Sequence, residues 1–440
     1  MNEHESGAAE RWPAERFRQL RQQADPDIDK VVAGYLETRP DGENALTMLR
    51  AVVTELARAK QEARVPSGVT GPSAVFDAID FGGDLPEWGS DTALLARGQS
   101  VFADYGLYQA VALFCKCLPM AYVEVSSAKV LAGVSDLATH SLTRRVAETG
   151  QMLVDVMGLK ATDSLTPGRP GHTTAIGLRL LHSFVRALAT EHFGDDWDTE
   201  RFGPPVNQEL LLATIFDFSV VTWEALESMG VRLGDDDRAA HLYTWSVFGH
   251  LMGVEACRDR PLTLEDVPPV SERLGRLYES SEEGRRLMAM LLAEMEEFMH
   301  LGWRKLPRSL VHWVFRDARH NAAQVPALLD VPPPAWWFNA LFALARAGNR
   351  YGRLMGPVDS VVRWLVRRAG RHIVVALIER HAGGRAAFQI PDELAAQWRI
   401  RQSKTARKAR KLRHTVRKGV RKGVEKAARA PVPAREGLPA

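Results

Sequence analysis

One histidine in this sequence lies inside an apolar, helix-forming segment and could bind a metal. His182 sits in the run Ile-Gly-Leu-Arg-Leu-Leu-His-Ser-Phe-Val-Arg (176–186), where helical spacing puts leucine and valine side chains beside the imidazole. Arg179 and Arg186 flank it on the same side of the helix. A neutral imidazole in a water-poor pocket suits an axial ligand of haem iron, and the arginines could meet haem propionates. By pattern alone, a buried core histidine explains these residues and is the commoner case.

Two further segments place polar side chains on apolar helix faces. Arg145 and Thr149 lie one turn apart on the preceding helix. Farther on, Asn207 is placed to cap a helix in which Thr214 follows a run of leucines. Buried arginine and threonine side chains are costly unless something pairs with them. A polar ligand such as dioxygen would be one such partner.

In their order and spacing, these segments resemble the family of bacterial latex-clearing proteins (rubber oxygenases) and fungal MpaB oxygenases. The resemblance runs over roughly residues 80–320. The matching points are Arg145 with Thr149, the Arg179-Leu-Leu-His182…Arg186 string, Asn207-Gln208…Thr214, and Leu242-Tyr-Thr-Trp245…Gly249…Gly253.

The resemblance implies an all-α fold with a globin-like helical core, extra N- and C-terminal helices and a b-type haem. His182 is then the axial iron ligand, and Arg145, Thr149 and Thr214 line the pocket around the haem. Members of the family use O₂ to cleave carbon–carbon double bonds in isoprenoid chains. Arg145 and Thr149 would donate hydrogen bonds to negative charge developing on oxygen.

The sequence departs from the rubber-cleaving members at one position in this pocket. Those members carry a lysine just before the distal threonine, where this chain has Glu148. A carboxylate could act there as a base or hydrogen-bond acceptor but not as an amine ligand. The family's distal acid has two candidate counterparts, Glu124 and Glu148. We therefore expect a small lipophilic alkene, isoprenoid in type, rather than rubber itself.

Composition and patterning agree with helices packed on helices. Apolar residues make up 45% and charged residues 25% of the 440 positions, as in ordinary globular proteins. Apolar residues recur at three- and four-residue spacing, while alternating strand patterns are missing. The three cysteines fit buried apolar positions better than disulfides or a metal site. The predicted parts are a helical N-terminal extension (1–65), the catalytic domain (66–330), C-terminal amphipathic helices (331–400) and a basic, disordered tail (401–440).

The charge distribution separates the tail from the body. Residues 401–440 carry fourteen Lys and Arg against two Glu, although the net charge of the chain is only +3. The body is therefore acidic, and nucleic acid is not an expected partner. Trp336 and Trp337, together with the tail, suggest peripheral contact with an anionic membrane. With no signal peptide or membrane-spanning segment in view, the expected location is cytoplasmic.

Two alternatives to the oxygenase remain open from sequence. One is a haem protein of another kind, such as a peroxidase-like enzyme or a sensor. The other is a helical scaffold without a cofactor, in which His182, Arg145 and Thr214 form a buried polar network. Bound iron separates the scaffold from both haem proteins, and product formation from an isoprenoid separates the oxygenase from the other haem proteins.

Overall fold

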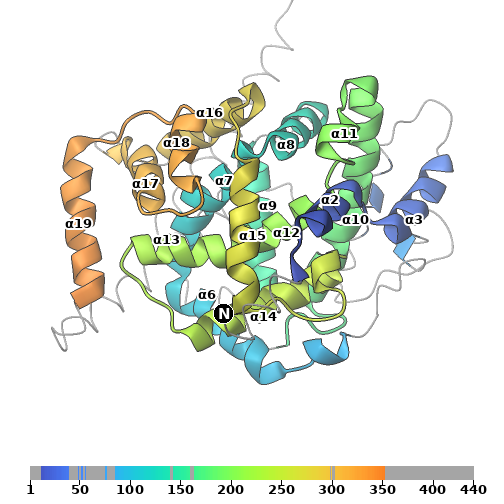
Figure 1. Ribbon diagram of the computed structural model, residues 1–440, viewed down its shortest axis with the longest axis horizontal. Coiled ribbons are helices and arrows are strands. Elements are labelled where there is room, and N and C mark those ends of the chain that lie inside the picture. Colours follow the sequence, from blue (N-terminus) through green and yellow to red (C-terminus); the bar gives the residue numbers. More distant parts are fainter. Residues whose placement is uncertain are drawn as a thin grey trace, which may run out of the picture. The chain divides into compact units, whose positions relative to one another are not determined.

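The computed structural model describes most of the chain between residues 11 and 351. The described residues are 11–38, 85–138, 142–158, 163–297 and 303–351, with the isolated positions 48, 51–52, 55, 75–76 and 299. Over these residues the regular structure is helical, with no strand and one isolated β-bridge between Glu124 and Tyr278 (Figure 1). The all-α prediction is confirmed. The basic tail at 401–440 and most of the predicted C-terminal helices lie outside the described residues.

The described part of the chain is a series of α-helices. In chain order they are α2 (Ala14–Gln22), α3 (Pro26–Glu37), α6 (Thr92–Ala112), α7 (Leu118–Val123), α8 (Val125–Ala138), α9 (Leu142–Met157), α10 (Pro170–Phe193), α11 (Thr199–Phe202), α12 (Gln208–Phe216), α13 (Thr222–Ser228), α14 (Asp235–Leu251), α15 (Val267–Leu274), α16 (Glu282–Glu297), α17 (Leu306–Phe315), α18 (Val325–Leu328) and α19 (Trp336–Tyr351). Two π-helical turns interrupt this order: η2 (Leu113–Cys117) follows α6, and η4 (Asp217–Val221) follows α12.

The centre of the core is the long contact between α6 and α14. The two helices approach so closely at Gly98 that a Cβ there would collide with the backbone carbonyl of Ala240. Only glycine fits this position, since any side chain would push the helices apart. Around this pair, aromatic and aliphatic side chains such as Leu95, Trp245 and Phe248 are almost fully buried.

Local sequence signals start the helices that matter for the site. Pro170 is the first residue of α10, where a missing backbone N–H costs nothing. Asn207 caps α12, its Oδ1 accepting a hydrogen bond from the Leu210 amide at 3.1 Å. This cap was predicted from the sequence and is confirmed. Helices α10 and α12 therefore begin at defined residues, which fixes the direction of His182 and Thr214 along them.

The π-helical turns η2 and η4 contact each other in the core. A π-turn leaves a carbonyl without its usual partner, so another donor must reach it. At η4 the carbonyl of Asp217 accepts from the Thr222 hydroxyl at 3.2 Å and from the Cys117 thiol at 2.9 Å. Cys117 belongs to η2, so η2 helps to satisfy the open carbonyl of η4.

The N-terminal helices α2 and α3 pack on the main core. Phe17 and Leu20 of α2 and Ile28 and Val32 of α3 are buried in the same cluster as the central helices. A helical N-terminal extension was predicted for residues 1–65. The described part of this segment, residues 11–38, is helical and contributes side chains to the main core.

No single helix among the described residues is long and apolar enough to cross a membrane, although one pair, Thr92–Gly106 with Tyr108–Val123, bent by 87°, meets the length and composition needed. On α19, Trp336 is 85% exposed while Phe338 is buried. The predicted membrane contact of Trp336 and Trp337 stays a prediction.

Candidate functional site

His182 lies on α10, half-buried, in a setting that leaves its ring without a hydrogen bond. Leu178, Leu181 and Val185 lie on the same side of the helix and pack against buried clusters. The Nδ1 atom of His182 is buried and has no hydrogen-bond partner among the described residues. Burial, followed by the positive charge of Arg186, lowers the pKa of His182 to about 4. The imidazole is therefore neutral near pH 7, the form in which a ring nitrogen can bind a metal.

The two arginines that flank His182 are paired with Asp25, the residue before α3, and with Asp29 in α3. Arg179 Nε and Nη2 donate to the two carboxylate oxygens of Asp25 at 2.6 and 2.8 Å. Arg186 Nε and Nη2 donate to Asp29 at 2.9 and 2.7 Å. The sequence predicted a cofactor-binding role for both arginines. In the structure both guanidinium groups bind aspartates, and their role toward a cofactor stays a prediction.

Further contacts fix α3 against α10 and α12. Gly253 has a positive φ of 73°, and a Cβ there would lie 2.5 Å from both Arg179 Nε and Asp25 Oδ2, so the ion pair needs glycine at this turn. The Gln208 amide donates to the carbonyls of Ala24 and Gly253, each at 3.0 Å. Charge pairing and backbone contacts together hold the histidine helix in one orientation.

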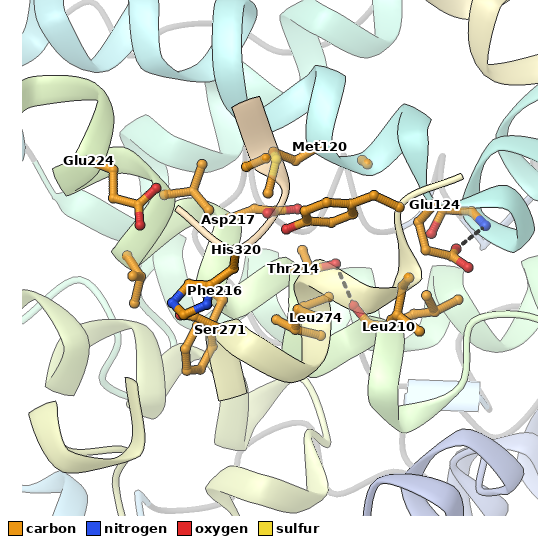
Figure 2. Close-up of a pocket in the computed structure, with 18 of the residues that line it drawn as sticks. Met120, Glu124, Leu210, Thr214, Phe216, Asp217, Glu224, Ser271, Leu274 and His320 are labelled. Carbon is orange, nitrogen blue, oxygen red and sulfur yellow. Dashed lines mark hydrogen bonds between the residues drawn. The ribbon is translucent and has the colours of Figure 1, made fainter. Parts of the chain in front are cut away.

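A cavity opens on the inner side of α12. The cavity has an empty volume of about 670 Å³, which includes the open solvent at its mouth. Thr214 lines it, with its hydroxyl donating to the Leu210 carbonyl at 2.9 Å (Figure 2). The apolar part of the lining is Met120, Ala121, Leu210, Ala213, Phe216, Val220, Val221, Leu274, Leu277 and Ala322. The polar part is Glu124, Ser127, Thr214, Asp217, Glu224, Ser271, Tyr278, Arg319 and His320.

The carboxyl groups of the cavity differ in their partners. Glu224 accepts a hydrogen bond from Lys116, a lysine with 1% of its side chain exposed, at 2.8 Å. Glu124 caps the start of α8, accepting from the Ser126 hydroxyl at 2.8 Å and the Ser127 amide at 2.6 Å. Asp217 has no such partner. Burial raises its pKa well above the usual range, and nearby Lys116 opposes that shift only in part.

The three residues predicted on the helix before His182 all fall on α9, which packs against α10. Thr149 is half-buried. The side chains of Arg145 and Glu148 lie outside the described residues. Their catalytic roles stay predictions, and Thr149 is the member of this group whose side chain the structure describes.

Asp217 and Tyr278 are site residues that sequence reasoning missed. Asp217 stands in the run Ile-Phe-Asp-Phe, where an acid among buried positions was the available signal. Burial raises the pKa of Tyr278, and the negative charges of Asp217 and Glu224 raise it further. Tyr278 follows α15 at a distant point of the sequence, so no local pattern connects it with Asp217.

Other metal chemistry finds no support among the described residues. They contain no group of three His, Cys, Asp or Glu side chains placed to hold an ion. The three cysteines are free and buried, as predicted. Burial raises the pKa of Cys117 and Cys257 to about 12, so both side chains are protonated thiols near neutral pH.

Comparison with known proteins gives the family. Residues 104–418, most of the chain, match the family described as ER-bound oxygenase mpaB/B'/Rubber oxygenase, catalytic domain. The chain therefore belongs to this family of oxygenases, as its motifs predicted.

One relative is the rubber oxygenase of Streptomyces sp. (strain K30). It is 24% identical over 380 residues, which cover 84% of this chain and 85% of the relative. Among solved structures, the latex clearing protein LCP in the closed state superposes with a TM-score of 0.60 at 20% identity. The match covers 80% of this chain and 90% of that one, so the two share a helical fold.

Proposed function

We propose that this oxygenase depends on haem b and uses O₂ to cleave or oxidise a carbon–carbon double bond in a lipophilic, isoprenoid-like substrate. The observation that carries the proposal is His182: a neutral, half-buried imidazole on a rigidly held helix, whose buried Nδ1 has no partner. Such a ring would suit an iron ligand, because no described residue forms a hydrogen bond with its buried nitrogen. Haem, when bound, would supply the binding and activation of O₂.

The chain's own residues then have defined tasks. Thr149 and Arg145 on α9 donate hydrogen bonds where negative charge develops on oxygen. Glu148, adjacent to Thr149, accepts a proton or a hydrogen bond from substrate. The apolar lining of the cavity beside Thr214 excludes water and holds the alkene.

Arg179 and Arg186 act in this proposal as positioning residues. Their guanidinium groups bind Asp25 and Asp29, so they influence the cofactor through the placement of α10. Metal-bound histidines commonly donate their second N–H to an acceptor. Among the described residues His182 has no such acceptor, so its orientation depends on this packing.

The test is the visible absorption spectrum of the full chain expressed with a haem precursor. We expect a Soret band that the His182→Ala variant loses or shifts, because the ring is the axial ligand. His312→Ala is the matched control. His312 lies on α17, away from α10, and its Nε2 atom is 3.1 Å from the Pro332 carbonyl oxygen. A colourless, well-folded wild type, or an unchanged band in His182→Ala, would overturn the proposal.

Product formation then separates the oxygenase from its alternatives. The purified holoprotein is incubated with an isoprenoid alkene under O₂, and carbonyl products are sought by mass spectrometry. Products that require both O₂ and His182 support the oxygenase. Haem binding without such products would instead favour a peroxidase-like enzyme or a sensor.

A further inference from the structure

The cavity beside Thr214 contains polar groups that a hydrocarbon substrate would leave without hydrogen bonds. We propose that this cavity binds the hydroxyl group of a lipophilic alcohol, with Asp217 and Tyr278 as the residues that hydrogen-bond it. The inference rests on the proposed function, because it names the substrate class of the same cavity. Its test nevertheless measures binding, which does not depend on turnover.

Asp217 is the carboxyl group available to a ligand. In Figure 2, Glu224 and Glu124 lie toward opposite ends of the cavity, with Asp217 and Thr214 between them. Lys116 binds Glu224, and the first turn of α8 binds Glu124. The Asp217 carboxyl makes no hydrogen bond to any residue in the described part of the chain, although its own backbone carbonyl accepts two.

Tyr278 adds a second polar group to the same wall. It is half-buried and lines the cavity together with Asp217 and Glu224; burial, and then these two carboxyl groups, raise its pKa. An isolated β-bridge holds the backbone of Tyr278 beside that of Glu124. Its hydroxyl makes no hydrogen bond to another described residue, so the cavity offers a phenol and a carboxyl group that both lack partners.

The chemistry of the two groups selects a neutral hydroxyl. The raised pKa of Asp217 favours the protonated acid, which both donates and accepts, as a phenol does. An alcohol oxygen also donates and accepts, so it can satisfy both groups at once. Among the charged side chains of the lining, Glu124 and Glu224 outnumber Arg319, which disfavours an anionic ligand. A hydrocarbon would leave both polar groups desolvated and unpaired.

The remaining lining residues indicate the chemistry of the rest of the ligand. Met120, Leu210, Phe216 and Leu274 surround the polar pair with apolar surface, which favours a hydrocarbon body. Thr214, predicted to lie beside the haem, lines the same cavity.

The experiment compares farnesol with farnesyl methyl ether, which keeps the isoprenoid chain but loses the hydroxyl donor. Dissociation constants are measured by isothermal titration calorimetry on the full-length holoprotein. We expect wild type to bind farnesol about tenfold more tightly, as one buried hydrogen bond left unmade would give. Equal binding of the two probes, or binding of neither, would overturn the proposal.

Variants assign that preference to the two residues. Tyr278→Phe and Asp217→Leu should each reduce it to less than about threefold. Asp217→Asn should keep it, because an amide also donates and accepts, and its similar size preserves the fold. Tyr243→Phe is the matched control, since that hydroxyl donates to the Trp88 carbonyl at 2.7 Å outside the cavity. A preference unchanged in both Tyr278→Phe and Asp217→Leu would contradict the assignment.

The same samples separate this inference from the proposed function. A tenfold preference in a protein without a Soret band would support the alcohol site and contradict the haem enzyme. A Soret band with cleavage products, but equal binding of the probes, would contradict the alcohol site alone.

Discussion

Helix α10 meets α3 through charged side chains, whereas the cavity on the inner side of α12 contains polar groups left unpaired. Toward α3, Arg179 and Arg186 each make two or more hydrogen bonds to aspartates. Along the cavity, the Asp217 carboxyl has no hydrogen-bond partner in the described residues. Satisfied buried charges hold a fold in one arrangement, while unsatisfied ones require a ligand or another explanation. The contrast therefore assigns the α3 contact to architecture and the cavity to binding.

Two buried histidines repeat this contrast. His241 on α14 lies between two indoles: Trp223 Nε1 donates to its Nδ1 at 2.8 Å, and Trp245 Nε1 lies 3.2 Å from its Nε2. His182 on α10 has a buried Nδ1 without any partner among the described residues. Since burial lowers the pKa of both rings, their environments differ chiefly in partners. His241 belongs to the packed core, and His182 is the one available to a cofactor.

The largest effect on stability is expected from breaking the charged contact between α3 and α10. Asp29→Ala removes the partner of Arg186, whose side chain is 7% exposed, and also the acceptor of the Ser183 hydroxyl. Leaving that cation buried and unpaired should lower the free energy of unfolding by about 3 kcal/mol. Urea unfolding monitored by circular dichroism measures the change.

The control for this variant is Glu15→Ala. Glu15 pairs with Arg18, but both side chains are more than half exposed, so the loss should stay below about 0.5 kcal/mol. Equal losses in Glu15→Ala and Asp29→Ala would remove the structural role given to the α3 contact.

The second prediction concerns pH and His241. Burial lowers the pKa of His241 to about 3 from its ordinary 6.5, so the unfolded chain takes up the proton first as pH falls. Stability is complete above about pH 6.5 and falls below it, by up to about 1.4 kcal/mol per pH unit from this residue. Unfolding measured near pH 7 and near pH 5 should show a smaller pH dependence in His241→Gln than in wild type. An identical pH dependence would mean that His241 is protonated in the fold.

The smallest effect on stability is expected inside the cavity. Thr214→Val keeps the shape of the side chain and removes a hydroxyl that bonds only the carbonyl one turn earlier. We expect the free energy of unfolding to change by less than about 0.5 kcal/mol, while oxygenation of an isoprenoid slows. A loss above about 1 kcal/mol with unaltered turnover would place Thr214 with the structural residues.

The sequence predicted the elements whose signals are local. The helix carrying His182 and the cap at Asn207 could be predicted from spacing and residue type. Helices α7 and α8 were missed, because the residues between 115 and 134 show neither a clear apolar stripe nor turn chemistry. Their apolar positions are buried by several neighbours at once, which removes the one-sided pattern that periodicity detects.

The partners of the site residues could not be predicted from the sequence, for a different reason. Asp25 and Asp29 lie more than 150 positions before the arginines that they bind, and nothing local distinguishes them from surface aspartates. Tyr278 and Asp217 meet only because the folded chain brings α12 and the segment after α15 to one cavity.

The π-turn η4 has a consequence for how the gene for this protein can change. Each residue of an α-helix advances about 100° around the axis, and a π-turn behaves as one inserted residue. Deleting a single codon within Asp217–Val221 would restore regular winding and rotate α13 by that angle relative to α12. Trp223 and Glu224 would then leave His241 and Lys116. The number of residues in this stretch is therefore fixed by the packing of α13, although many single substitutions within it would keep the π-turn.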